Sequence, residues 1–213
     1  MSVILLALLL ERKIRRRRET RHICDADLRI LNLNASSGGS ERDNLIFYAS
    51  DVNSALREKY AEGERNNWLL ASDAYHHFPW LMTPVTNPQS VPENSYNRAH
   101  RKCQLDAVKC IGVVKSRFRC LSRQRSKQKT LMYSPEATGK LIKACCVLHN
   151  VMIQHDYVLP SEEEVTEELE SLPERTENNA RAIKVEESDE DAEERTLVQA
   201  GRSIRSQIIV TNF

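Results

Sequence analysis

The sequence predicts an α/β fold, because short apolar runs typical of strands alternate with longer stretches whose apolar residues recur at helical spacing. Three observations support this prediction. Trp68–Tyr75 is an apolar run that closes on an acidic residue, Asn94–Phe118 is a long basic helical pattern, and Ser134–Ile153 is an apolar helical pattern. The 213 residues are enough for one domain with a proper core and additional tails.

Two elements are expected before this region. Ile23–Asn34 alternates polar and apolar residues, which predicts a strand or a tight hairpin that turns at Asp25–Asp27. A helix is then expected over Leu45–Tyr60, because its apolar residues recur at helical spacing. Asp43 is a suitable cap for this helix, and Gly63 is expected to end it.

The central region is predicted to be a strand, a connection and a long helix. Trp68–Ala71 is a short strand candidate, and the proline-punctuated His76–Pro88 is expected to be neither helix nor central strand. Asn94–Phe118 predicts a helix with an apolar and a basic side. The basic side carries Arg98, Arg101, Lys102, Lys109, Lys115 and Arg117. Gly112 inside this helix costs about 1 kcal/mol relative to alanine, which indicates a place of close packing.

Downstream, the pattern predicts one buried helix, an acidic stretch and a terminal helix. Ser134 caps the first helix, with Pro135 at its first position. The buried stripe of that helix is expected to be Leu141, Ile142, Cys145, Leu148 and Met152. Glu162–Glu194 has little apolar content and a high net charge, so it is expected to be largely disordered. Thr196–Phe213 regains apolar spacing and predicts a helix.

The formal charge of +1 conceals a strong segregation of charge along the chain. Arg98–Lys143 contains thirteen lysine or arginine residues and two acidic ones, whereas Ser161–Glu194 is dominated by acidic runs. A basic body with an acidic tail is common in proteins that meet nucleic acid, although ordinary solvated surface gives the same pattern. The basic run Arg15–Arg18 is either a nuclear localisation signal or a chance cluster.

The cysteines and the N-terminus bear on the cellular compartment. None of the six cysteines forms a C-x2-C pair, and so few in a chain of this length do not indicate a disulfide scaffold. The cysteines therefore favour a reducing compartment, the cytosol or the nucleus. The expected localisation of the chain is the nucleus, with the cytoplasm as the alternative. Val3–Leu10 is apolar but shorter than the roughly 20 residues that span a bilayer, and its basic residues follow it. No membrane segment or signal peptide is expected.

Several histidines and cysteines are candidates for a metal site. His149 is expected to be a hydrogen-bonded structural residue, since no second ligand stands at helical spacing from it. His76–His77 is expected to form an exposed turn rather than a metal pair. His22, Cys24 and Asp25 could form a mixed ligand set, but the sequence shows nothing downstream that completes it.

Four motifs occur in the order and spacing of a known family. They are PWLMTP (79–84), YNRAH (96–100), CIGVVKSRFRCL (110–121) and ACCVLHN (144–150). CDADLRILNLNA, GGSERD and AGRSIRSQIIVTNF match further segments of the same family. The chain thereby resembles the Harbinger-type transposase-derived nucleases of the DDE superfamily of endonucleases, over residues 22–157 and the extreme C-terminus.

The resemblance implies an RNase H-like fold, in which helices cover both faces of a mixed sheet, here incomplete at the N-terminus. The chain then divides into an atypical apolar and basic N-terminus (1–21), a partial endonuclease domain (22–157), a disordered acidic linker (158–195) and a C-terminal helical segment (196–213). In such nucleases three carboxylates bind two divalent cations, usually Mg²⁺, and a DNA phosphodiester is hydrolysed. Magnesium requires hard oxygen ligands, so aspartate and glutamate are needed.

The chain departs from the family pattern at all three acidic positions. No aspartate stands in residues 1–20, where the first is expected. Ser72 takes the place of the second and leaves Asp73 displaced by one residue, while Val108 takes the place of the glutamate. A one-residue shift in a strand turns a side chain to the opposite face. The nearest acid to Val108, Asp106, lies about 200° round the helix axis.

These departures predict a scaffold that has lost its metal site and is catalytically impaired. The alternative is a partial rescue, in which Asp73 remains as the catalytic and metal-binding residue and is joined by Asp25 or Asp27. A degenerating copy or an incomplete gene model, with core strands missing from the N-terminus, is a third interpretation.

The long basic helix is the part of the site that needs no carboxylate. In the family it faces the DNA channel, and phosphate binding requires only positive charge. Lys109, Lys115, Arg117 and Arg119 are therefore the expected DNA contacts, with a solvated helix face as the alternative. The family nuclease also operates with a separate Myb-like DNA-binding protein. A retained docking surface for such a partner is the second functional hypothesis.

Overall fold

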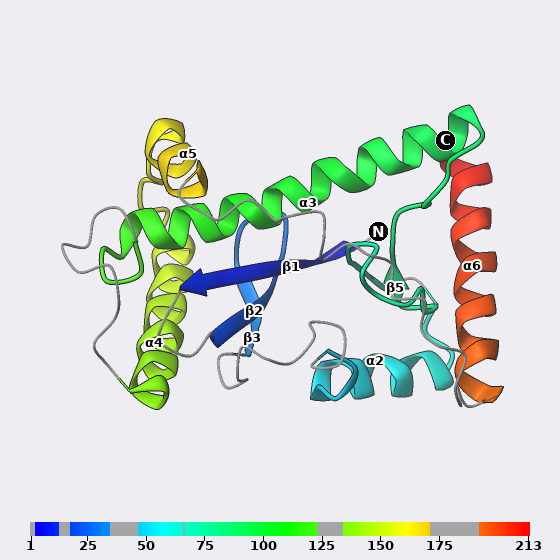
Figure 1. Cartoon of the computed structure of the whole chain (residues 1–213), viewed down its shortest axis with the longest axis horizontal. Helices are drawn as coiled ribbons and strands as arrows, with labels where there is room; N and C mark the ends of the chain where they lie inside the picture. Colours follow the sequence, from blue (N-terminus) through cyan, green and yellow to red (C-terminus); the bar gives the residue numbers. More distant parts are fainter. Residues whose placement is uncertain (1–2, 13–17, 35–46, 66, 123–133, 171–191) are drawn as a thin grey trace. The chain divides into compact units, whose positions relative to one another are not determined.

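The computed structural model describes residues 3–12, 18–34, 47–65, 67–122, 134–170 and 192–213, which form two compact units (Figure 1). Unit 1 comprises residues 1–4, 42–104 and 175–213, and unit 2 comprises residues 5–41 and 105–174. The long helix α3 (Val91–Arg117) contributes its first part to unit 1 and its second part to unit 2. Both units contain strands and helices, which confirms the predicted α/β class.

The strands of unit 2 form an antiparallel arrangement in which β2 lies between the other two. They are β1 (Val3–Arg12), β2 (Arg18–Cys24) and β3 (Ile30–Asn34). Cys24 pairs with Ile30, so the hairpin predicted within Ile23–Asn34 is confirmed. The carboxylate of Asp25 holds the turn, because its Oδ1 accepts hydrogen bonds from the backbone N–H groups of Asp27 (3.0 Å) and Arg29 (2.8 Å).

The apolar run Val3–Leu10 is part of strand β1. In the described part of the chain, no helix combines the length and the apolar composition that crossing a membrane requires.

Helix α4 (Pro135–Gln154) closes the core of unit 2. The Ser134 hydroxyl accepts from the N–H of Ala137 at 3.2 Å, which confirms the predicted cap. The core is formed by Ile111, Val114, Leu121, Ile142, Cys145 and Cys146. The predicted stripe was wrong for Leu148, which is 53% exposed, whereas Thr138 and His149 are buried. The buried side of α4 is therefore rotated about the helix axis, by about one residue position, relative to the predicted side.

A short acidic helix, α5 (Glu162–Glu170), stands where disorder was predicted for Glu162–Glu194. Its N-terminus is a capping box: the N–H of Glu164 donates to the Ser161 hydroxyl, and the N–H of Ser161 donates to the Glu164 carboxylate. Val165 is buried, and a Cβ built on Gly112 would come within 2.7 Å of its Cγ1. The close packing predicted at Gly112 is thus confirmed, and its partner is α5. Residues 171–191 lie outside the described part.

The described residues of unit 1 include helices α2 and α6 and a short parallel strand pair, together with the first part of α3. The strands are β4 (Trp68–Leu70) and β5 (Leu81–Met82), and the helices are α2 (Asp51–Ala61) and α6 (Ala192–Asn212). Helix α6 confirms the predicted terminal helix.

Helix α2 begins later than the predicted Leu45. The hydroxyl of Ser50 accepts from the N–H of Asn53 at 3.3 Å, so Ser50 is the cap of α2. The predicted cap, Asp43, lies outside the described residues. Gly63, with a φ of 104°, follows the end of α2 as expected.

His77 corrects the expectation of an exposed His76–His77 turn, because its side chain is buried. Its Nδ1 accepts from the N–H of Thr83 at 3.1 Å, and its Nε2 donates to the carbonyl oxygen of Gly201 on α6 at 3.0 Å. Burial lowers the pKa of His77 to about 4. A Cβ on Gly201 would lie 2.6 Å from the His77 carbonyl oxygen, so this contact requires a glycine. His77 is a structural link in unit 1.

Candidate functional site

The end of β4 carries the residues that the family resemblance associates with catalysis. The N–H of Ala71 donates to the carbonyl oxygen of Met82 at 2.9 Å, and the chain then leaves the strand. Ser72 is half-buried, and its hydroxyl has no hydrogen-bond partner in the described part of the chain. Asp73 is exposed in the turn that follows. In the described residues of its unit, Asp73 joins no group of three side chains that could hold a metal ion.

The corresponding positions on α3 also lack a suitable carboxylate. Val108 is half-buried, and so is Asp106. Ala107, between them, is completely buried. Asp25, a candidate for rescue, already uses Oδ1 to hold the β2–β3 turn. The positions that the resemblance assigns to acidic residues hold a serine hydroxyl and a valine side chain without any ligand atom. They do not fit Mg²⁺, which requires convergent charged oxygen ligands.

The four predicted DNA-contact residues occupy different environments in unit 2. Lys115 is 2% exposed, contrary to the solvent-facing position expected for it. Arg117 donates to the carbonyl oxygens of Tyr157 (3.4 Å) and Val158 (3.2 Å). Partial burial lowers the pKa of this guanidinium. Lys109 is partly exposed and lies 3.9 Å from the Glu162 carboxylate. Arg119 is exposed after the end of α3.

His149 has the structural role that the sequence predicts. It is completely buried on α4, and its Nε2 lies 2.8 Å from the carbonyl oxygen of Leu28. Burial lowers its pKa, and the nearby Arg117 acts in the same direction. Cys145 and Cys146 are buried beside it, and burial raises the pKa of each thiol to about 12, so both are small apolar core residues.

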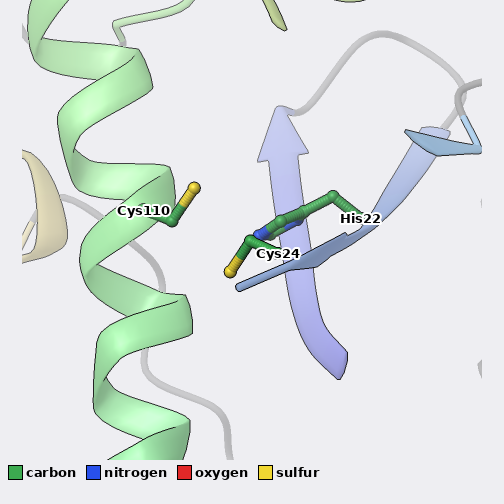
Figure 2. Close-up of side chains that lie close together, drawn as sticks. All are labelled: His22, Cys24 and Cys110. Carbon is green, nitrogen blue, oxygen red and sulfur yellow. The ribbon is translucent and has the colours of Figure 1, made fainter. Parts of the chain in front are cut away.

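A second group of potential ligands lies between β2 and α3 (Figure 2). His22, Cys24 and Cys110 are almost completely buried, and one ligand atom of each lies within 4.8 Å of the others. A hydrogen bond with Cys110 and the nearby His22 lower the pKa of Cys24 to about 6, although burial opposes this. The same contact with Cys24, together with burial, raises the pKa of Cys110. Cys24 is therefore the readier of the two to carry a thiolate.

Sequence reasoning named His22 and Cys24 but found no downstream residue to complete the set, and this expectation was wrong. Cys110 completes the group from a distant helix. The alternation of histidine and cysteine in a strand is a signal within the sequence, because residues two apart point to one face. Cys110 had no comparable signal in the sequence, because its distance from His22 and Cys24 depends on how α3 packs against β2.

Comparisons with known proteins agree with the motifs. Residues 15–150 match the family described as DDE superfamily endonuclease. The Xenopus laevis protein named "Putative nuclease HARBI1" is 37% identical over 144 residues, which are 68% of this chain and 40% of the relative. The Rattus norvegicus protein of that name is 29% identical over 191 residues, 90% of this chain and 49% of the relative.

The Homo sapiens protein of that name is 32% identical over 133 residues, 62% of this chain and 36% of the relative. This chain thus spans less than half the length of each of these relatives. No solved structure matches it. Because the matched family segment covers well over half of the 213 residues and contains the four motifs between residues 79 and 150, the chain belongs to the DDE superfamily endonucleases.

Proposed function

We propose that this chain is a nuclease-derived protein that binds DNA and is impaired in hydrolysing it. The observation that carries this proposal is the donor set at the end of β4 and on α3. Ser72 and Val108 stand where the family requires an aspartate and a glutamate, and Asp73 is exposed in a turn. The proposed scaffold is the RNase H-like fold of the family. Basic side chains on this scaffold can bind DNA phosphates even when no catalytic cation is bound.

The missing carboxylates should weaken Mg²⁺ binding strongly, because Mg²⁺ gives up its hydration water reluctantly. It binds proteins through carboxylates in near-octahedral geometry, and the family reaction uses two such ions. A hydroxyl and an isopropyl group cannot replace the charge of two carboxylates. This supports impaired hydrolysis in the chain.

A plasmid-nicking assay with Mg²⁺ or Mn²⁺ tests the impairment. We expect no cleavage by the chain or by Asp73→Asn, while a family relative that retains all three acidic residues serves as positive control. Cleavage that disappears in Asp73→Asn would contradict the proposal and establish the rescue interpretation. Cleavage that survives in Asp73→Asn and follows the chain through purification would also contradict the proposed impairment, and would assign the activity to residues other than Asp73.

The proposed DNA contacts are reduced to the basic residues that remain accessible, Lys109 and Arg119. The Lys109–Glu162 pair is long, at 3.9 Å, and largely exposed, so it contributes little and a phosphate can compete for the lysine. Arg119 is exposed just beyond the end of α3. Lys115 and Arg117 are set aside as DNA contacts, because Lys115 is buried and Arg117 already donates to two backbone carbonyls.

Fluorescence anisotropy with a DNA duplex over a range of NaCl concentrations tests this assignment. We expect affinity to fall steeply with salt, and Lys109→Ala and Arg119→Ala each to reduce the slope of log K against log salt by about 1. Lys140→Ala on α4 is the matched control, since Lys140 is exposed and pairs with Glu136. The proposal fails if binding ignores salt or if the control variant behaves like the other two.

An exposed apolar face on α4 supports a second candidate function, the docking of a Myb-like DNA-binding protein. Val147, Leu148 and Val151 are all exposed on this helix. Apolar docking should tolerate salt that dissociates DNA. A pull-down with a Myb-like partner domain should therefore persist at high NaCl and be lost in Leu148→Asp. Loss of capture by salt alone would exclude apolar docking.

We propose the nucleus as the compartment in which the chain acts, on the basis of the basic run Arg15–Arg18. A fluorescent fusion should become cytosolic when these four arginines are changed to alanine. Unchanged nuclear accumulation in that variant would show that the run is not the signal.

A further inference from the structure

The buried group His22, Cys24 and Cys110 lies apart from the positions that the family resemblance assigns to the catalytic acids. His22 and Cys24 flank Ile23 on β2, so the two-residue period of a strand places both side chains on one face. Cys110 extends from α3 toward that face (Figure 2). A ring nitrogen of His22 and the two sulfur atoms lie within 4.8 Å of one another.

The environment of the His22 ring is a second observation that points to a ligand at this group. It is 2% exposed, yet outside the group itself neither of its ring nitrogens has a hydrogen-bond partner in the described part of the chain, and within the group it contacts the Cys24 thiol. Buried imidazoles elsewhere in the described chain are satisfied: His149 contacts Leu28 and Arg117, and His77 contacts Thr83 and Gly201. A buried polar atom without a partner is costly, and such atoms mark strain, function or an absent ion.

The donor set selects the kind of cation. One imidazole nitrogen and two sulfurs are the ligands of zinc-type sites and are unsuited to magnesium or calcium, which take oxygen ligands. Zn–S and Zn–N bonds of about 2.3 and 2.0 Å place tetrahedral ligand atoms roughly 3.5 Å apart. The three ligand atoms, which lie within 4.8 Å of one another, have to close by at most about 1 Å to reach this spacing.

Charge balance favours the same cation. A neutral histidine and two thiolates carry two negative charges, which a divalent zinc ion cancels, so the filled site is neutral in its buried position. Each thiol releases its proton to solvent as its sulfur binds the metal. The three residues supply three of the four ligands of a tetrahedral zinc ion.

We propose that His22, Cys24 and Cys110 bind a single zinc ion that ties strand β2 to helix α3 within unit 2. Asp25, which the sequence places beside Cys24, is not counted as a ligand, because its carboxylate lies outside the group of ligand atoms within 4.8 Å and its Oδ1 holds the turn. The site requires none of the acidic positions of the family. It therefore stands or falls independently of the proposed DNA binding.

Metal titration of the full chain, purified under reducing conditions, tests the site. We expect one equivalent of Zn²⁺ to bind, measured by competition with a chromophoric chelator. Co²⁺ alone should give the absorption of a tetrahedral ion with two sulfur ligands. Cys24→Ser and Cys110→Ser should each lower zinc affinity at least about tenfold, and His22→Gln should do the same. Cys120→Ser is the matched control, because this exposed thiol lies outside the group.

Three outcomes would overturn the proposal. They are the absence of stoichiometric Zn²⁺ binding by the reduced chain, a cobalt spectrum without two sulfur ligands, and full affinity retained in Cys24→Ser or Cys110→Ser. Mass spectrometry showing that Cys24 and Cys110 form a disulfide even under reducing conditions would also exclude the ion. If a variant fails to fold, the cobalt spectrum of the unaltered chain decides the matter.

Discussion

His149 on α4 donates a hydrogen bond from Nε2 to the carbonyl oxygen of Leu28, 2.8 Å away in the turn between β2 and β3. Its Nδ1 lies 3.4 Å from Nη1 of Arg117, and a guanidinium can only donate, so the tautomer with hydrogen on Nε2 satisfies both contacts. Leu28 has a φ of 63°, which is uncommon for a residue other than glycine. The buried histidine thus links α3 and α4 to the turn.

The motifs shared with the family are held together in the same way, by side chains that bond to backbone. In unit 1, Tyr96 donates to the carbonyl oxygen of Thr83 at 3.0 Å, and Asn97 exchanges two hydrogen bonds with the backbone of Val85. Arg205 of the C-terminal motif donates to the carbonyl oxygens of Thr83 and Pro84. These motifs maintain a scaffold, and their presence does not require an intact catalytic site.

Replacing Asn150 by alanine should destabilise unit 2. The Asn150 amide accepts from the N–H of Ile30 at 2.8 Å and donates to its carbonyl oxygen at 2.7 Å, so Asn150→Ala removes both bonds. We expect the free energy of unfolding to fall by about 1–3 kcal/mol, measured by urea denaturation. The exposed Asn212→Ala on α6 should change it by less than about 0.5 kcal/mol. Equal effects of the two variants would contradict this role for Asn150.

Arg117→Ala should affect stability more than DNA affinity. The side chain donates to the carbonyls of Tyr157 and Val158 and contacts His149, so its loss removes these contacts. The two carbonyl groups are exposed and can then bond to water, so a decrease of no more than about 1 kcal/mol in unfolding free energy is expected. DNA affinity should fall no more than in the control Lys140→Ala. A larger loss of affinity with unchanged stability would instead assign Arg117 to a phosphate contact.

His77 should make stability depend on pH. Burial lowers its pKa to about 4 from an ordinary value of 6.5, with Arg205 acting in the same direction, so the unfolded chain takes up a proton before the folded one does. Its contribution is complete above pH 6.5 and is lost as pH falls toward 4. The loss is on the order of 3 kcal/mol.

The measurement is denaturant unfolding across this pH window. Burial also lowers the pKa of His100 and His149, so the informative quantity is the difference between variants. His77→Gln should flatten part of the decline, whereas His155→Gln, at an exposed position, should leave the profile unchanged. A profile in His77→Gln as steep as in the original chain would rule out this coupling.

Gly112→Ala should destabilise the packing of α5 on α3. The added Cβ would meet Cγ1 of Val165 at 2.7 Å, which costs about 1–3 kcal/mol of unfolding free energy. Val165→Ala removes the clashing methyl groups, so the double variant should cost less than the sum of the two single changes. Additive effects in this double-mutant cycle, measured by thermal or urea unfolding, would show that the two residues do not meet.

Sequence patterns alone predicted most of the elements of this chain, because local signals define them. The period of apolar residues indicated α3, α4 and α6, and the alternation in Ile23–Asn34 indicated the hairpin. Helix α5 was missed although Ser161 and Glu164 form a capping box, since its acidic composition outweighed that signal. The order and spacing of several motifs also established the family.

Tertiary structure decided which side chains are buried and which meet. The basic side predicted for α3 included Lys115, but this residue is buried. Unit 2 covers more of the helix than a pattern with one apolar and one solvent-facing basic side implies. Cys110 lies close to His22 and Cys24, although they are far apart in the sequence. Between them the chain passes through β3, α2, β4 and β5. Local periodicity shows on which side of its own helix or strand a residue lies. The distance to a partner on another element is set by packing, which no local pattern contains.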